Sequence, residues 1–368
     1  MSDLKKRLSE PTHIYYDINV YNKFSPSSGA LKLDFSEARN VPFVNKASDY
    51  LLSIVRFQTD TSSLPSYNVI PLPGSLPNRL IYSITLELVA RNTGDIVGVH
   101  QQYITWEPEN KNARLGDEDY YWGNSLSHFT LLINKAIDAA NMALYGNGND
   151  HIICNYNMND SKLEVYGLYH NLADNGNLPL HNVITKIYFN RELQTWFNTL
   201  SYERYSTATL GRFYRLKFDW YFSNIKYNGN QDYILNKQQY ETSANISPVS
   251  SIVFTSPTLP CVYNQLSNPA IYENNVKVTN SSNSNFFPII TDIQVNEQFY
   301  KSNILYVPNA QYRYIDLISN SGINNIDIQC YWRHKDGTFY PLYLYSGMCA
   351  SLKLLFEKKE TEYLIATE

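Results

Sequence analysis

The densest carboxylate group in the chain is Asp117-Glu118-Asp119, which stands directly before the aromatic run Tyr-Tyr-Trp at 120–122. Three acidic side chains in one loop could hold Ca²⁺, and two of them could serve as the acid and base of a glycosidase, with the aromatic rings stacking on sugar. No oxygen ligand recurs at calcium-loop spacing, so a solvated acidic loop is the favoured interpretation. Asp117, Glu118 and Asp119 are kept as the one candidate metal site.

Other groups that could do chemistry are scattered. The sequence has no Gly-x-Ser-x-Gly nucleophile motif, no phosphate-binding loop and no Gly-x-Gly-x-x-Gly. Its seven histidines never occur as His-x-His or His-x-x-x-His. Cys154, Cys261, Cys330 and Cys349 contain no Cys-x-x-Cys pair and are interpreted as reduced, mostly buried thiols. We therefore predict no catalytic residues, no cofactor and no enzyme activity.

The composition favours a protein that contacts other proteins. The 30 Lys and Arg against 34 Asp and Glu give a net charge of −4, and charged residues make up only 17% of the chain, where soluble domains average about 25%. Its 32 Tyr hydrogen-bond without ionising, and Tyr is enriched at interfaces. Near neutrality argues against binding nucleic acid. No uninterrupted apolar run is long enough to span a membrane, and no apolar segment of a secretory signal follows the basic start.

The elements that must position these residues are mostly strands. Alternation and turn signals predict a hairpin over 80–106, and Asp336-Gly337 predicts another between the last strands. A three-and-four apolar spacing from Ser125 to Leu144 predicts one amphipathic helix, with Asn124 or Ser125 as its N-cap and Gly146 at its end. Further strands are expected at 50–57, 151–156, 162–169, 213–225, 250–255, 288–295, 311–317, 326–332, 339–345 and 351–356, and a short helix capped by Asn190 at 190–197.

Ten or eleven strands that do not alternate with helices favour an all-β fold. We predict a single jelly-roll β-sandwich with Greek-key connections, one or two inserted helices and long loops. Residues 1–45 are expected to form an N-terminal arm, 46–360 the jelly-roll body and 361–368 a C-terminal tail. Residues 120–210 are either an inserted, outward-facing subdomain or loops of the same jelly roll.

Several framework segments of this chain resemble the penton (minor capsid) proteins of virophages and Polinton- or adinto-like viruses. They lie at 50–57 (YLLSIVRF), 248–256 (PVSSIVFTS), 312–317 (YRYIDL), 326–332 (IDIQCYW) and 351–359 (SLKLLFEKK). The resemblance implies single jelly rolls that form pentamers at the vertices of icosahedral shells, whose facets are double jelly-roll trimers. Pentons of the adenovirus type can carry an integrin-binding loop. This chain has none, so receptor binding is not carried over.

The resemblance and the composition together predict a structural virion protein, a homopentameric penton capsomer made and assembled inside the host cell. Its expected partners are itself, the double jelly-roll major capsid protein and, through the N-terminal arm, other minor capsid proteins. One alternative is the single jelly-roll major capsid protein of a small virus. Another is a carbohydrate-binding or hydrolysing jelly roll that uses Trp106, Trp122 and the acidic loop. Five-fold rings would distinguish a penton from monomers with glycan affinity.

Overall fold

The chain folds into two compact units in a computed structural model. A sandwich unit comprises 1–64, 111–119 and 248–368, and an inserted unit comprises 65–110 and 120–247. Within these, the structure describes residues 11–23, 29–74, 78–109, 121–146, 152–168, 183–205, 209–218, 225–227, 231–241, 246–262, 265–267, 270–273, 276–277, 287–295, 303–308 and 313–359.

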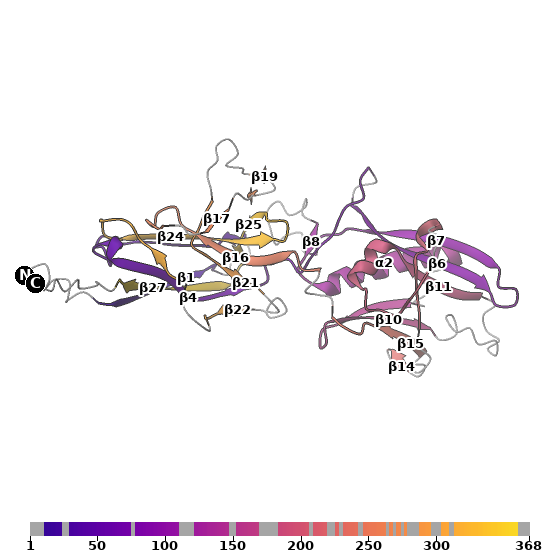
Figure 1. Ribbon diagram of the computed structural model, residues 1–368. Helices are drawn as coiled ribbons and strands as arrows, with labels where there is room; N and C mark the ends of the chain where they lie inside the picture. The colour runs from indigo at the N-terminus through magenta and orange to yellow at the C-terminus, as the bar shows by residue number, and fades with distance from the viewer. Residues whose placement is uncertain are drawn as a thin grey trace, which may run out of the picture. The chain divides into compact units, whose positions relative to one another are not determined.

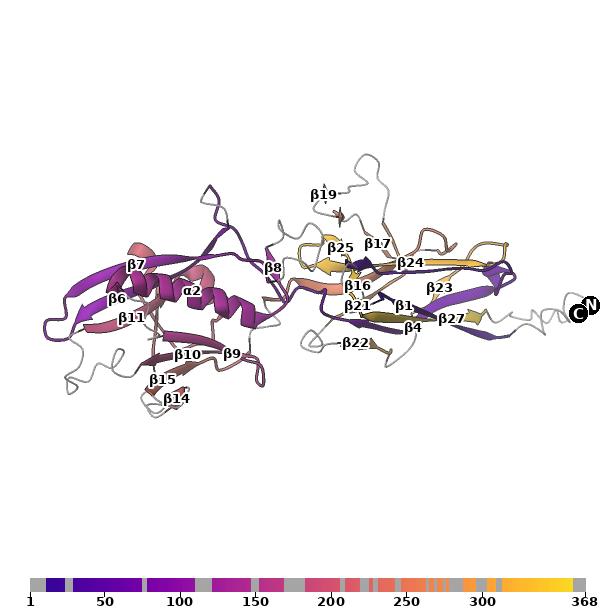
Figure 2. The ribbon, with the colours of Figure 1, turned by 180° about the vertical axis from the view of Figure 1, so that it is seen from behind.

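The sandwich unit consists of two antiparallel sheets that form two layers (Figure 1). The first sheet has the order β1 (His13–Tyr21), β27 (Cys349–Lys358), β4 (Tyr50–Asp60), β22 (Asn303–Tyr306), with β23 (Ile315–Asp316) also paired to β4. The second has the order β21 (Thr291–Gln294), β16 (Val249–Thr255), β24 (Asn325–His334), β25 (Phe339–Pro341), with β3 (Asp34–Ala38) paired to β24. The views from both sides show the same two layers (Figure 2).

Aromatic side chains join the two layers. Phe57 of β4 meets Phe254 of β16 edge to face, with ring centroids 4.9 Å apart, and Phe35 of β3 lies 6.3 Å from Phe57. All three are fully buried. On β27 the alternation is as predicted at Leu352 and Lys353, the first buried and the second partly exposed, because successive strand side chains point to opposite faces.

The predicted hairpin forms between β24 and β25. Gly337 takes a φ of +91°, a conformation that glycine adopts without steric cost, and the Asp336 carboxylate accepts a hydrogen bond from the Thr338 amide at 2.8 Å. The antiparallel sheets agree with the predicted all-β fold class.

The first 45 residues, expected from the sequence to form an N-terminal arm, contribute two strands to the sandwich sheets. β1 pairs along its length with β27, and β3 pairs with β24. Tyr16, Ile18 and Phe35 are buried, so these short apolar stretches are parts of the sandwich. Proline and glycine interrupt the segment without separating it from the core.

The inserted unit contains two further sheets. One has the order β12 (Tyr202–Arg204), β13 (Tyr214–Leu216), β11 (Val183–Phe189), β6 (Arg79–Ala90), β7 (Ile96–Thr105). The other has the order β14 (Ile225–Tyr227), β15 (Gln231–Lys237), β10 (Lys162–Leu168), β9 (Ile152–Asn157). These boundaries differ from the expected 120–210 segment, because the hairpin β6–β7 belongs to the same unit. The hairpin belongs to the inserted unit because its buried side chains are part of the hydrophobic core of that unit. No turn or change of composition in the sequence defines this boundary.

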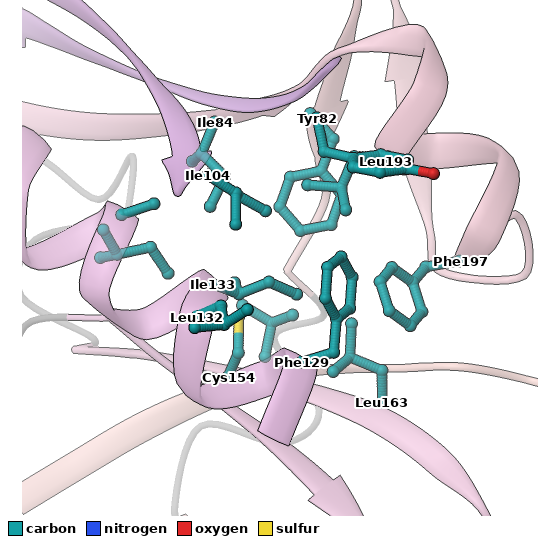
Figure 3. Close-up of a cluster of buried hydrophobic side chains, with 14 of the residues drawn as sticks. Tyr82, Ile84, Ile104, Phe129, Leu132, Ile133, Cys154, Leu163, Leu193 and Phe197 are labelled. Atoms are coloured by element: carbon teal, nitrogen blue, oxygen red, sulfur yellow. The ribbon is translucent and has the colours of Figure 1, made fainter. Parts of the chain in front are cut away.

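Helix α2 (Leu126–Tyr145) packs between these two sheets. Ile84 and Ile104 approach it from one side, and Cys154 and Leu163 from the other (Figure 3). The helix is also tied to β9, because the Asn134 side chain hydrogen-bonds the backbone of Cys154 in both directions, at 2.8 and 2.9 Å.

The helix ends only partly match the prediction. Gly146 has a left-handed φ of 72° and its amide donates to the Met142 carbonyl at 3.0 Å, as expected of a C-terminal glycine. At the N-terminus, Ser125 makes no side-chain cap. The Glu109 carboxylate instead accepts from the amides of Asn124 and Ser125 at 2.8 and 3.2 Å. Asn190 caps α4 (Arg191–Trp196) as predicted.

The remaining described elements are short. They are β2 (Leu31–Lys32) with β26 (Tyr343–Leu344), β5 (Tyr67–Asn68) with β8 (Trp122–Gly123), β17 (Gln265–Ser267) with β20 (Phe287–Ile289), β18 (Tyr272–Glu273) with β19 (Val276–Lys277), and the 3-10 turns η1 (Ala47–Asp49) and η3 (Thr209–Gly211). No helix in the described part of the chain is long and apolar enough to cross a membrane.

Candidate functional site

The acidic loop that the sequence singled out, Asp117, Glu118 and Asp119, lies outside the described residues. Its proposed aromatic partners are placed. Trp106 is only 2% exposed and packs in the core of the inserted unit against Tyr67 and His128. Sugar stacking requires an accessible ring face, so Trp106 cannot provide one. Trp122 lies in β8 and is partly buried.

Histidines and carboxylates form no metal-ligand cluster of three or more among the residues that the structure describes. His128 of α2 sits close to the Tyr67 hydroxyl, with 2.6 Å between Nδ1 and Oη. Burial lowers the pKa of His128, which favours the neutral imidazole. This histidine is a partly buried, hydrogen-bonded residue at the edge of the core.

The four cysteines are free thiols, and Cys154, Cys261 and Cys330 are buried while Cys349 is exposed. Burial raises the pKa of Cys154 and of Cys261 to about 12. A thiol must ionise to act as a nucleophile or metal ligand, so the buried three are inert packing residues, as predicted from their spacing.

The difference in exposure between Cys349 and the other three cysteines predicts selective labelling. In the native protein at pH 8, Cys349 should react with a maleimide at least about 100-fold faster than the other three thiols, because it alone among the four cysteines is exposed to the reagent. Peptide mass spectrometry after brief labelling measures this, with the Cys349→Ser variant as the control. Comparable labelling of Cys154 or Cys330 in the folded chain would contradict the assignment.

Two buried carboxylates that the sequence did not single out lie in the inserted unit. Glu87 of β6 is 4% exposed. It accepts hydrogen bonds from Arg212 Nη1 at 2.6 Å and from the Tyr188 hydroxyl at 3.1 Å, and Lys186 Nζ lies 3.6 Å away. A buried carboxylate with this many partners is satisfied structurally, and it has no free oxygen with which to act as a base.

Glu164 of β10 is the second, at 5% exposed. Its carboxylate accepts from Asn157 Nδ2 at 3.0 Å and from the Tyr166 hydroxyl at 2.7 Å, and it pairs with Lys237 Nζ at 2.8 Å. Burial alone would raise the pKa of Glu164, but the hydrogen bonds from Lys237, Asn157 and Tyr166 outweigh burial and lower it. The group is therefore ionised and structural.

A depressed carboxyl pKa makes stability depend on pH. The unfolded chain binds the proton more readily than the folded chain, so the Glu164 contribution is complete above about pH 4.5 and is lost as the pH falls through the folded pKa. Glu164→Gln should cost about 2 kcal/mol at pH 7, and this difference should shrink below about pH 4.

Urea unfolding, followed by the tryptophan fluorescence of the inserted unit, measures the difference in the free energy of unfolding between Glu164→Gln and the native chain at pH 7 and at pH 3.5. Glu192→Gln, on the surface of α4, is the matched control. A Glu164→Gln difference that is the same at pH 7 and pH 3.5 would contradict the role of the ionised carboxylate.

The chain combines antiparallel β-sheets with a composition poor in charge, which is typical of proteins that make extensive contacts with other proteins. Residues 14–358 match the model of the family described as Sputnik minor capsid protein V18/19. The chain belongs to this family, and the predicted relationship to virophage capsid proteins is confirmed.

Individual relatives agree with the family match. The chain is 28% identical over 194 residues to structural protein V19 of Sputnik virophage, covering 49% of this chain and 85% of V19. It is 33% identical over 151 residues to uncharacterized protein V18 of the same virophage, covering 37% of this chain and 86% of V18.

Two solved structures share the fold. A chain of the Sputnik virophage cryo-EM structure superposes with a TM-score of 0.73 at 22% identity, over 95% of this chain and 99% of that one. The mavirus penton protein superposes with a TM-score of 0.62 at 17% identity, over 95% and 100%. This chain is accordingly a structural capsid protein of the virion, with the fold of a penton protein.

Proposed function

We propose that this chain is a penton capsomer, a homopentamer that closes the five-fold vertices of an icosahedral capsid. The observation that supports this most strongly is the combination of family membership over 14–358 with a penton fold that covers 95% of the chain. The low fraction of charged residues lowers the desolvation cost of covering the surface with neighbouring subunits.

The proposed neighbours are a double jelly-roll major capsid protein and other minor capsid proteins. The proposed N-terminal contact with these neighbours involves residues 1–10, because β1 and β3 belong to the sandwich sheets. We further propose that the protein assembles inside the host cell and acts without catalysis, a cofactor or direct binding of the genome. The net charge of −4 is compatible with a shell component that leaves genome binding to other chains.

Sedimentation analysis of the purified full chain tests the proposal. A penton predicts a species of five copies of the 42.6 kDa chain, about 213 kDa, in equilibrium with monomer as the protein is diluted. A chain that stays at 42.6 kDa at every concentration would contradict it, and closed shells of many copies would favour the alternative of a major capsid protein.

Removing residues 1–10 tests the proposed contact with neighbouring capsid proteins independently of the contact between subunits of the pentamer. The truncated chain should still form the 213 kDa species, because the sheets remain complete, and should lose binding to neighbouring capsid proteins. Truncation at residue 45 is unsuitable, because it would delete β1 and β3 from the core.

A further inference from the structure

Strand β1 forms an open edge of the first sandwich sheet. It pairs with β27 on one side, in register from His13–Glu357 to Tyr21–Cys349, and no strand in the described part of the chain pairs with its other side. The strand is nine residues long and contains neither proline nor lysine, two residue types with which proteins commonly block pairing at an edge. β1 is therefore able to accept a further strand.

The hydrogen bonds at the two ends of β1 show which of its backbone groups point away from β27. The Lys358 amide donates to the Thr12 carbonyl at 2.8 Å, and the Asn22 amide donates to the Met348 carbonyl at 3.0 Å. In an antiparallel pair, residues that exchange hydrogen bonds alternate with residues whose N–H and C=O groups point outward. The outward groups make no other backbone hydrogen bond within the described residues. They belong to the five exposed residues of the strand, His13, Tyr15, Asp17, Asn19 and Tyr21.

The side chains beside this edge favour an acidic partner with strand-forming residues. Tyr15 and Tyr21 are 55% and 56% exposed, and aromatic rings form stabilising cross-strand pairs with aromatic and β-branched side chains. Asp17 pairs with Arg56 at 2.9 Å and with Lys353 at 3.3 Å. Two cations therefore surround one carboxylate, which leaves the group with a net positive charge.

Residues 360–368, which follow β27 in the sequence, have the matching composition. They include two Thr, one Tyr and one Ile, residue types that are enriched in strands. They also include three Glu and no Lys, Arg, Pro or Gly. Residues 1–10, by contrast, contain no aromatic or β-branched residue and carry three basic against two acidic side chains. Of these two segments, 360–368 is the one whose charge and strand propensity suit the β1 edge.

We infer that residues 360–368 of one copy of this chain add as a strand to the β1 edge of the next copy. Backbone hydrogen bonds to the outward groups of β1 supply the contact, and side-chain pairs with Tyr15 and Tyr21 give it specificity. The contact is heterologous, because a segment of one subunit binds a different surface of its neighbour, as a cyclic ring requires. This inference rests on the proposed pentamer and assigns one of its contacts.

Proline at position 19 tests the edge. Asn19→Pro removes one outward N–H and leaves the hydrogen bonds to β27 in place, which is the arrangement in which edge strands tolerate proline. The variant should need at least about tenfold more protein than the native chain for half assembly in sedimentation analysis. Asn19→Ala keeps the amide and should assemble as the native chain does, and thermal unfolding checks that both variants fold. Pentamers of Asn19→Pro at native concentrations would overturn the inference while leaving the pentamer intact.

Hydrogen exchange of peptides spanning residues 13–21 identifies the occupant. In the native pentamer, the outward amides of β1 should exchange at least about tenfold more slowly than in the diluted monomer. A chain ending at Lys359 retains β27, should need at least about tenfold more protein for half assembly, and should leave β1 unprotected at every concentration.

Two results would overturn the assignment of residues 360–368 of the next copy. Protection of β1 already present in the diluted monomer would mean that the edge is occupied within one chain. Protection of β1 in the chain ending at Lys359 would mean that another segment binds there. A native chain that never forms pentamers would overturn both this inference and the proposed function.

Discussion

Replacing Phe57 with alanine is expected to destabilise the sandwich unit by about 3–5 kcal/mol. Phe57 is fully buried and lies between Phe35 and Phe254, so its removal leaves a cavity between the two sheets. Hydrogen exchange measured on peptides of β27 and β16 reports the loss, because the amides of these central strands exchange only when the unit opens.

Gln58→Ala is the matched control for Phe57. Gln58 follows Phe57 on β4, is partly exposed, and should change the exchange little. Equal acceleration in the two variants would contradict a core centred on the Phe57 contacts.

Replacing Phe129 with alanine should destabilise the inserted unit by a similar amount, about 3–5 kcal/mol. Its ring is fully buried in α2 and contacts the rings of Tyr67, Tyr82 and Trp196, with centroid distances of 5.3, 5.9 and 4.7 Å. Because this core is separate from that of the sandwich unit, exchange should accelerate in β6, β10 and α2 peptides more than in β27.

Leu131→Ala provides the control within the same helix. Leu131 is 51% exposed, so its truncation should cost well under 1 kcal/mol. A comparable loss from Leu131→Ala would mean that α2 does not pack between the two sheets in the orientation described.

Much of the fold could be predicted from the sequence where local chemistry decides it. The Asp336-Gly337 turn, the alternation of β27 and the apolar spacing of α2 each depend on neighbouring residues. The N-cap of α2 could not be predicted, because the group that takes the place of the cap is the Glu109 carboxylate, far along the chain. The inclusion of the β6–β7 hairpin in the inserted unit likewise depends on the shared core.

The candidate functional site could also be predicted only in part from the sequence. The absence of catalytic motifs and the low charge indicated a contact protein, and the family match agrees with that. The hydrogen-bonded networks around Glu87 and Glu164 were not predicted, because each joins residues from separate strands or loops.

Cryo-EM reconstruction of the virus particle that carries this chain tests the central claim most directly. We predict density for the sandwich unit in a ring of five at each five-fold vertex. Density for this chain within the facets, or its absence from the purified particle, would contradict a vertex capsomer.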